Sequence, residues 1–421
     1  MHILFVTPAY PPFPGGGERY VRALAFNLAA RGHRITAVTT AAQLETQFWL
    51  GTGTPSTQIE QDGPISLIRC PLRPLPAGQS ALLLWRKLMI VLSALPGDQT
   101  AVLQKMARLI PPAQQLEPAL AALPDDIQLV HGFNLSWEYP LLAGWQFARQ
   151  RGIPFVVTPF AHFGTDKQDR LARNATMDHQ RHLLADADAV LALTSVEIDG
   201  LREWGVQAKH TAVISGGIDP LPDLPTGTAV RDSYVPDSNP FALFIGRMSR
   251  AKGALDAMKA TLALNAQGTP LTLALIGQTS AEFDQLYASL TEAEKERIRP
   301  LGILTDVEKH ALLAACAMLL LPSHTDSFGI VFLEAWAHGR PVIGARAGGI
   351  PGVVDDGENG ILVPFGDVAA LTGAMRRLLT EPDLGKTMGQ RGQQKVQEVF
   401  TWESVGERVL QIYNHLLNAA A

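Results

Sequence analysis

Residues 322–341 have the sequence PSHTDSFGIVFLEAWAHGRP and directly follow the apolar run Met318–Leu321. Four consecutive apolar residues of this kind predict a short buried strand. A helix is predicted to begin near Ile330 and to end at Gly339 and Pro341, because glycine favours helix C-termini and proline cannot continue a helix. The segment is therefore predicted to be a strand, a loop and a helix in succession.

The predicted helix start combines two chemical features. Its backbone N–H groups have no partner within the helix, and the helix dipole favours an anion there, so a phosphate would be stabilised. Asp326 precedes this start and Glu334 lies one to two turns along. Two carboxylates beside a phosphate site suit a ligand that carries both a diphosphate and hydroxyls, and a nucleotide sugar is such a ligand. The backbone groups at the helix start belong to Ser327, Phe328, Gly329 and Ile330.

The composition predicts a two-domain or three-domain protein with large cores. The chain has 421 residues, of which 47% are hydrophobic and 18% are charged. The net charge of -5, without a basic block, argues against a nucleic-acid partner. Cys70 and Cys316 are the two cysteines, which predicts a reduced compartment and no disulfide framework.

Two apolar segments bear on localisation. The first residues, Met1–Pro8, contain no Lys or Arg before a short apolar run and therefore predict a first strand and not a signal peptide, which favours a cytoplasmic protein. Residues 81–92 are too short to span a bilayer, which needs about 20 apolar residues, and they contain Arg86 and Lys87. This segment is either a helix of the core or an interfacial helix that contacts a membrane carrying a lipid acceptor.

Strands and helices alternate in both halves of the chain, which predicts an α/β protein with two doubly wound, Rossmann-like domains. The domains are expected at residues 1–219 and 241–400, joined by a linker rich in Pro, Gly and Asp at 220–240. Residues 402–421 carry a helical apolar stripe that packs either on its own domain or back on the first one. Strands are expected at 2–7, 34–40, 127–131, 154–158, 189–194, 207–214, 241–246, 271–277, 317–322, 341–344 and 361–363.

Two further motifs suit a phosphate. Arg247 and Lys252 follow the predicted strand 241–245, and two cations five residues apart after a strand can reach one diphosphate, although either could simply be solvated. Gly15, Gly16 and Gly17 directly precede a predicted helix, where they either allow close approach of a ligand or form a plain turn. Because these glycines begin eight residues after the first strand and no acid ends the second strand, a dinucleotide-cofactor site is not expected.

Together these motifs resemble the family 4 glycosyltransferases, retaining enzymes with two facing Rossmann-like domains in the GT-B fold. The resemblance covers nearly the whole chain, and it favours packing of residues 402–421 back on the first domain. It rests on the three glycines, on Gly246-Arg247 with Lys252-Gly253, on Asp326 with Glu334, on Gly348-Gly349-Ile350-Pro351, and on 356–363, DGENGILV.

Three residues depart from the family pattern. Asp326 stands where the family usually has Glu, which keeps the charge and shortens the side chain by one methylene. Gly352 replaces the Glu that often follows Gly-Gly-x-Pro, and Gly216-Gly217 replaces an Asn-Gly at the end of the first domain. None of these changes removes the phosphate site.

The resemblance implies roles for several residues. Glu334 should bind the ribose hydroxyls of the donor, and Asp326 should lie beside its sugar and diphosphate. The family places a sugar-facing histidine after the strand at 154–158, which favours His162 as the active-site histidine. His131 is the alternative and could line the acceptor cleft.

The implied reaction moves a sugar from a nucleoside diphosphate sugar to a hydroxyl acceptor with retention and without a cofactor. Metal is not expected, because Asp186-Ala187-Asp188 lacks a ligand set and the cations already supply charge. Two alternatives remain open: a non-catalytic nucleotide-sugar-binding subunit, and another two-Rossmann enzyme such as a sugar-nucleotide epimerase or a phosphorylase. The nucleotide base, the donor sugar, the acceptor and the oligomeric state are not specified by the sequence.

Overall fold

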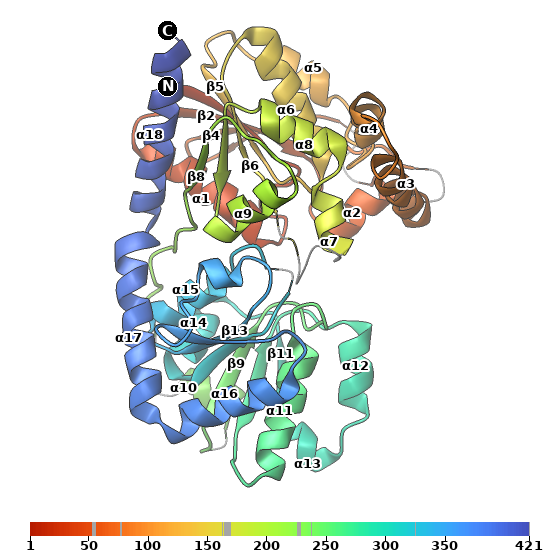
Figure 1. Cartoon of the computed structure of the whole chain (residues 1–421). Coiled ribbons are helices and arrows are strands. Elements are labelled where there is room, and N and C mark those ends of the chain that lie inside the picture. Colours follow the sequence, from red (N-terminus) through yellow and green to blue (C-terminus); the bar gives the residue numbers. More distant parts are fainter. Residues whose placement is uncertain are drawn as a thin grey trace. The chain divides into compact units, whose positions relative to one another are not determined.

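The structure is a computed structural model of the chain. It describes residues 1–421 except residues 53–55, 76–77, 162, 164–169, 225–228, 237, 325 and 421. The described residues of 1–217 together with 402–420 form one compact unit, unit 1, and those of 218–401 form a second, unit 2. Strands and helices alternate along the chain in both (Figure 1).

Unit 1 is built on an eight-stranded sheet in the order β3-β4-β2-β1-β5-β6-β7-β8. All neighbouring strands are parallel except β3, which runs antiparallel to β4. Every residue of β1, β5, β6 and β7 is buried, as expected of parallel strands covered by helices on both faces. The strands are β1 (His2–Val6), β2 (Arg34–Thr40), β3 (Gln58–Asp62), β4 (Ile65–Cys70), β5 (Leu129–Phe133), β6 (Phe155–Thr158), β7 (Ala189–Ala192) and β8 (Thr211–Val213).

The helices of unit 1 bury one apolar face each. In the first helix, Tyr20, Val21, Leu24 and Leu28 are buried at helical spacing, and Gly32 follows its end in a left-handed conformation, φ 84°. The helices are α1 (Gly16–Ala30), α2 (Glu45–Leu50), α3 (Gly78–Ser93), α4 (Thr100–Ala107), α5 (Leu116–Ala121), α6 (Glu138–Arg151), α7 (Arg170–Ala175), α8 (Asp178–Asp186), α9 (Ser195–Glu203) and α18 (Trp402–Ala420).

The C-terminal helix α18 packs on unit 1. Val405, Val409 and Tyr413 are fully buried at a spacing of four residues, which places them on one face of the helix. This helix lies beside α1 (Figure 1), and the Tyr20 and Trp402 rings meet edge to face at 5.3 Å. The buried face of this 19-residue helix therefore belongs to the same core as the first helix of the chain.

Unit 2 has a six-stranded parallel sheet in the order β11-β10-β9-β12-β13-β14. Its strands are β9 (Phe241–Ile245), β10 (Thr272–Ile276), β11 (Ile298–Gly302), β12 (Met318–Leu321), β13 (Val342–Ala345) and β14 (Gly360–Val363). Its helices are α10 (Ala229–Tyr234), α11 (Ala254–Ala266), α12 (Ala281–Ala288), α13 (Glu292–Lys295), α14 (Asp306–Ala315), α15 (Ile330–Ala337), α16 (Val368–Thr380) and α17 (Pro382–Val399), with a 3-10 turn at Ile350–Gly352.

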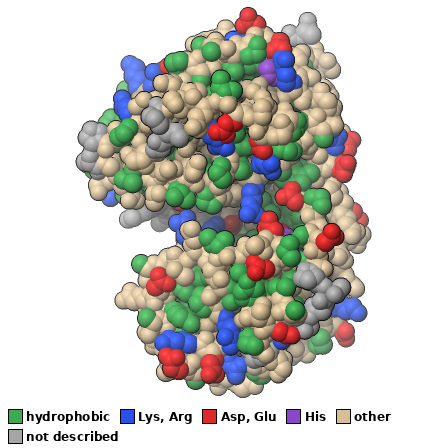
Figure 2. Space-filling model, turned by 180° about the vertical axis from the view of Figure 1, so that it is seen from behind, with side chains coloured by type: hydrophobic (Ala, Val, Ile, Leu, Met, Phe, Trp, Pro, Cys, Tyr) green, Lys and Arg blue, Asp and Glu red, His purple; other side chains and the backbone are tan. Residues whose placement is uncertain are grey.

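The surface carries charges of both signs. Lys and Arg side chains are interspersed with Asp and Glu on the face drawn in Figure 2, without a large region of one sign. Cys70 and Cys316 are both buried free thiols. Among the described helices, none combines the length and the apolar character needed to cross a membrane.

Candidate active site

The sheet of unit 2 reverses its direction of growth between β9 and β12. From β9 the chain adds β10 and then β11 on one side, and from β12 it adds β13 and β14 on the other. Open α/β sheets bind ligands outside the carboxyl ends of the strands at such a switch point. Arg247 and Lys252 follow β9, and Asp326 and Gly329 follow β12, so the predicted motifs lie at the carboxyl ends of the two strands at this switch point.

Lys252 and Asp326 are in direct contact. The ammonium of Lys252 donates to Oδ1 of Asp326 at 2.9 Å, and the two side chains are 26% and 18% exposed. The other oxygen of Asp326, Oδ2, is buried and has no hydrogen-bond partner among the residues that the structure describes. An unpaired buried acceptor is costly, so this oxygen is suited to a hydroxyl or amide donor from a ligand.

The start of α15 is open to an anion. Gly329 precedes the helix in the left-handed region, φ 83°, and no side chain caps the helix. A Cβ on Gly329 would lie 2.7 Å from the ring of Phe332, so a larger residue would be both strained and crowded. The first backbone N–H groups of α15 are therefore available at the carboxyl end of β12.

Glu334 has the same arrangement as Asp326. Its Oε1 accepts from the ammonium of Lys309 at 2.8 Å, and Lys309 also pairs with Asp306 at 2.9 Å. Oε2 of Glu334 is buried and lacks a partner within the described part of the chain. Glu334 is 9% exposed and Lys309 8% exposed, which excludes the simpler interpretation of Glu334 as a solvated helix acid.

The glycine pair after β13 supports the Asp326 loop. The N–H of Gly349 donates to the carbonyl of Asp326 at 2.8 Å. A Cβ on Gly349 would lie 1.8 Å from the Ser327 carbonyl oxygen, and one on Gly348 would lie 2.4 Å from that of Asp326. Only glycine permits this approach, so Gly348 and Gly349 fix the position of the loop.

Arg247 lies exposed at the end of β9, directly after Gly246.

In unit 1 the three predicted glycines begin α1. Gly15 is the N-cap, in an extended conformation, and a Cβ on Gly17 would lie 3.3 Å from the ring of Phe160. Phe160 belongs to the loop after β6, so the glycines and this loop are neighbours within unit 1. Gly16 is exposed.

His131 is a buried part of the sheet. Nδ1 lies 2.6 Å from the hydroxyl of Tyr413 and Nε2 lies 2.8 Å from Oγ1 of Thr158, and the side chain is 0% exposed. Burial lowers the pKa of His131 to about 3, so the ring is neutral. Both ring nitrogens are engaged inside unit 1, and no part of the ring is exposed to an acceptor.

His162 lies outside the described residues, but its neighbours show how the loop after β6 is held. Glu197 accepts from the N–H of Ala161 at 2.6 Å and from that of Leu193 at 2.8 Å. The ring of Phe163 lies where a Cβ on Gly200 would be, at 2.3 Å. Burial raises the pKa of Glu197 to about 7, against the lowering effect of its two backbone donors.

The Asp186-Ala187-Asp188 string is engaged in ion pairs. Arg149 pairs with Asp186 at 2.7 Å and with Asp188 at 2.9 Å, and Lys209 pairs with Asp188 at 3.1 Å. These contacts tie both carboxylates to the junction of α8 and β7. In the part of the chain that the structure describes, no group of three or more His, Cys, Asp or Glu side chains could hold a metal ion.

Three side chains that contact the predicted residues or their loops were not identified by the sequence analysis: Lys309, Tyr413 and Glu197. Lys309 lies 25 residues from Glu334 and Tyr413 lies 282 residues from His131. The only signal for Lys309 was its place in an otherwise apolar helix face. Glu197 lies three residues after Thr194, which caps the start of α9. A glutamate is common at this position of a helix, so the sequence offers no reason to expect contacts with the loop after β6.

The sequence matches two glycosyltransferase models. Residues 15–217 match the model described as glycosyl transferase 4-like domain, and residues 228–395 match the model described as glycosyl transferases group 1. One model thus covers most of unit 1 and the other most of unit 2.

Relatives and solved structures extend over the whole chain. It is 27% identical over 436 aligned positions to glycogen synthase of Mycobacterium tuberculosis, covering 98% of this chain and 94% of the relative. Sucrose-phosphate synthase from Thermosynechococcus elongatus superposes with a TM-score of 0.72 at 24% identity, covering 99% of each chain. Anabaena HepE, solved in complex with UDP-glucose, superposes with a TM-score of 0.68 at 19% identity, covering 99% of this chain and 100% of HepE.

Two parallel α/β units, each matched by a glycosyltransferase model, define a glycosyltransferase of the GT-B fold. The chain belongs to family 4 of these enzymes. The predicted fold class, family and enzyme class are confirmed.

Proposed function

We propose that this enzyme transfers a sugar, with retention, from a nucleoside diphosphate sugar to a hydroxyl acceptor. The observation that carries the proposal is the shared arrangement of Asp326 and Glu334. In each acid, one carboxylate oxygen accepts a hydrogen bond from a lysine, and the other is buried without a partner among the described residues. Two such acceptors beside an open helix start suit a ligand that brings both hydroxyl donors and phosphate.

In the proposed complex, each of these protein groups binds a different part of the donor. A hydroxyl of the donor sugar donates to Oδ2 of Asp326, and a ribose hydroxyl donates to Oε2 of Glu334. The diphosphate lies between Arg247, Lys252 and the N–H groups that begin α15. Among the supporting solved structures, HepE was obtained in complex with UDP-glucose.

In the proposed reaction the bond between the anomeric carbon and the diphosphate oxygen breaks first, and negative charge develops on the leaving nucleoside diphosphate. Arg247, Lys252 and the α15 backbone stabilise this charge, an effect that often dominates catalysis. The acceptor hydroxyl then bonds to the anomeric carbon from the side that the diphosphate leaves. Its proton passes to a phosphate oxygen, so the configuration is retained and no separate base is needed. His162 is proposed to position the sugar or the acceptor.

We further propose that the reaction requires no metal ion or cofactor. The positive charge that a divalent ion would bring to the diphosphate is supplied by two cationic side chains and a helix start. EDTA should therefore leave the rate unchanged, whereas a loss of activity that Mn²⁺ or Mg²⁺ restores would contradict this part of the proposal.

A membrane contact through α3 is the third part of the proposal. Leu84, Leu88 and Val91 are 69%, 45% and 58% exposed and lie at the helical spacing i, i+4, i+7. The helix carries the exposed cation Lys87 and no acid. An exposed apolar stripe beside a cation is typical of helices that lie at an anionic membrane surface.

The experiment is a screen of UDP-, GDP- and ADP-sugars for binding, followed by an acceptor panel with the selected donor. Nucleoside diphosphate should be released only with an acceptor, and NMR of the product should show the anomeric configuration of the donor. Asp326→Asn should bind donor and lower kcat by about 10²-fold or more while the protein stays folded. Donor binding without turnover on any acceptor would favour a non-catalytic subunit, and an inverted product would refute retention.

A further inference from the structure

Unit 1 contains a pocket of about 260 Å³ whose walls are mostly apolar. Trp49 of α2, Leu82 and Leu83 of α3, Ile110 and Trp137 form these walls. The rings of Trp49 and Trp137 meet edge to face at 5.0 Å. The volume lies just below the usual range of ligand pockets, about 300–1,000 Å³, so it suits part of a ligand.

The pocket lies at the edge of the sheet where a substrate of unit 1 is expected. Ser136 and Trp137, which line it, stand between the end of β5 and the start of α6. The sheet of unit 1 changes its direction of growth between β1 and β5, so this is a switch point like that of unit 2. The ring of Phe48 joins the pocket to the loop after β1, because it lies 4.6 Å from the ring of Trp137 and 5.2 Å from that of Phe13.

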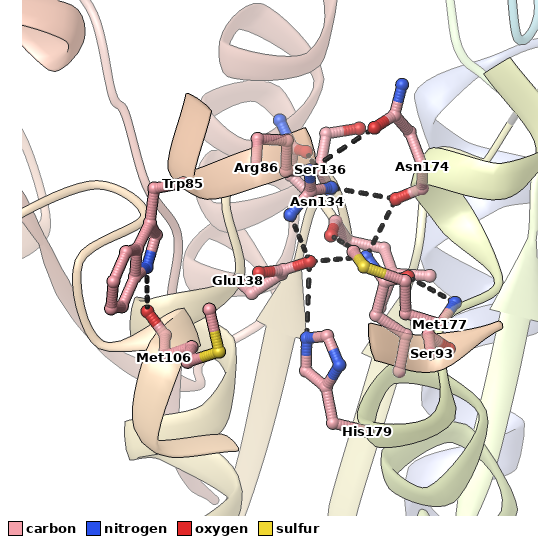
Figure 3. Close-up of polar contacts among 12 residues, drawn as sticks. Trp85, Arg86, Ser93, Met106, Asn134, Ser136, Glu138, Asn174, Met177 and His179 are labelled. Carbon is pink, nitrogen blue, oxygen red and sulfur yellow. Dashed lines mark hydrogen bonds and ion pairs between the residues drawn. The ribbon is translucent and has the colours of Figure 1, made fainter. Parts of the chain in front are cut away.

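Arg86, the one charged side chain that lines the pocket among the described residues, is engaged in hydrogen bonds. Figure 3 shows Arg86 between Glu138 and Asn174: it donates to Oε1 of Glu138 at 2.5 Å, and to the side-chain and backbone oxygens of Asn174 at 3.3 and 2.8 Å. Burial raises the pKa of Glu138, but Arg86 and His179 outweigh it and the pKa lies below its ordinary value, so the carboxylate is ionised. The charge of Arg86 is thus neutralised, which disfavours a phosphate inside the pocket and favours an apolar group.

The exposed apolar residues are concentrated in the part of the sequence that supplies four of the pocket residues, Trp49, Leu82, Leu83 and Arg86. Nine of the thirteen large hydrophobic side chains that are exposed in the described residues lie between positions 44 and 102. Leu83 is 42% exposed and lines the pocket, while its neighbour Leu84 is 69% exposed and does not. Lys87 is exposed on the same helix, which has no acid, so an anionic group outside the pocket would meet a cation.

We propose that this pocket binds a segment of the hydrocarbon chain of a lipid acceptor, whose anionic headgroup remains outside near Lys87. The inference rests on the proposed function, since it names the class of acceptor for the same transfer. The chain reaches the pocket over the exposed face of α3, which would contact the membrane that carries the lipid. The neutralised charge of Arg86 and the mostly apolar walls favour a hydrocarbon chain over a free sugar.

The first test compares n-decyl phosphate with n-butyl phosphate, which share a headgroup and differ by six methylenes. Both are titrated into the full-length protein by calorimetry, below the concentration at which the decyl compound aggregates. Each buried methylene contributes about 0.8 kcal/mol, so burial of half of the extra chain predicts at least a 30-fold lower Kd for n-decyl phosphate. Equal affinities would overturn the proposal.

A matched pair of variants separates the pocket from the surface. Leu83→Trp should fill the pocket and reduce the preference for the decyl chain to less than 3-fold. Leu84→Trp makes the same change on the adjacent exposed position, and the preference should remain. If both variants bind the decyl chain like the unaltered protein, the chain adsorbs elsewhere on the surface and the pocket is not its site.

Donor binding keeps this test distinct from that of the proposed function. Both variants should bind the nucleotide sugar with unchanged Kd, since neither position belongs to unit 2. Normal donor binding without any chain preference would refute the pocket alone. Failure of the unaltered protein to bind any nucleotide sugar would refute the proposed function, whatever the decyl compound does.

Discussion

The two units have sheets of one type but opposite chemistry at their carboxyl edges. At the edge of unit 2, two lysines pair with two acids, and each acid keeps one buried oxygen unpaired among the described residues. The edge of unit 1 has one such pair, Arg86 with Glu138, whose Oε2 is likewise buried and unpaired among the described residues. It also carries the aromatic rings of Phe48, Trp49 and Trp137, and its histidine is buried with both nitrogens engaged. Because the switch-point geometry is shared, the difference lies in the side chains placed there. One edge suits a charged, hydroxyl-rich ligand and the other suits an apolar one.

Removing the cations from the edge of unit 2 should have the largest effect. Arg247→Ala combined with Lys252→Ala is expected to lower kcat/KM by about 10²–10⁴-fold, since each charged hydrogen bond contributes about 1.5–3 kcal/mol. Steady-state kinetics with the selected donor measure the loss. Arg250→Ala is the control. Arg250 lies on the same loop as Arg247 and Lys252, but it is exposed and pairs with Glu282, so its removal should change the rate little. Unchanged kinetics in the double variant would mean that the diphosphate binds elsewhere.

The second prediction concerns the lysine behind Glu334. Lys309→Met keeps the length of the side chain and removes the charge that holds Oε1 of Glu334. The free carboxylate would rotate or take up a proton, so the Kd of the donor should rise about 10–100-fold with a smaller change in kcat. Calorimetric titration with the nucleotide sugar checks this. Lys295→Met removes a partly exposed lysine of the same unit as a control. An equal effect in that variant would show that Lys309 has no specific role.

The sequence predicted the central strands well because buried parallel strands are continuous apolar runs, as in Phe241–Ile245 and Met318–Leu321. It missed β11, whose residues Arg299 and Pro300 are only half-buried at the edge of the sheet. It also missed α17, in which three glycines obscure the helical pattern. These glycines are explained by tertiary packing, since a Cβ on Gly392, for example, would lie 2.1 Å from the ring of Trp336.

The candidate site was predictable where its residues lie in one motif. Asp326 and Lys252 were both proposed from the sequence, because each follows a recognisable strand, and the structure shows them as an ion pair. Glu334 was proposed as well, but its partner Lys309 was not, since only the fold brings α14 beside α15. For His131 a strand-end position suggested an acceptor site, whereas Tyr413 on the last helix occupies one of its nitrogens.

The third prediction tests the apolar edge through α3. Leu84→Gln combined with Leu88→Gln should weaken binding to vesicles that contain anionic phospholipid by about 10-fold, because two exposed leucines no longer enter the interface. Co-sedimentation with the vesicles measures this. Val213→Gln replaces a hydrophobic residue that is 38% exposed on β8 and should leave binding unchanged. If the unaltered protein does not sediment with vesicles, α3 does not contact a membrane.

The smallest effect is expected from replacing His131. The pH dependence of unfolding tests whether this histidine is structural or catalytic. Burial lowers the pKa of His131 to about 3, whereas an unfolded histidine has a pKa of about 6.5, so the unfolded state takes up the proton first as the pH falls. The contribution of this group to the free energy of unfolding is therefore fully present above pH ~6.5, and it is lost progressively as the pH falls toward ~3. Between pH 7 and pH 5.5 this group should lower the free energy of unfolding by about 1 kcal/mol.

Urea unfolding at the two pH values reveals this contribution when variants are compared. In His131→Gln the decrease between pH 7 and pH 5.5 should be smaller than in the unaltered protein by that amount. Tyr413→Phe removes the hydroxyl at 2.6 Å but keeps the buried histidine, so it should lose about 1 kcal/mol at both pH values with the pH dependence intact. If His131→Gln keeps the full pH dependence, the histidine is not the titrating group. If it loses turnover while its unfolding is unchanged, His131 belongs to the reaction and not to the core of unit 1.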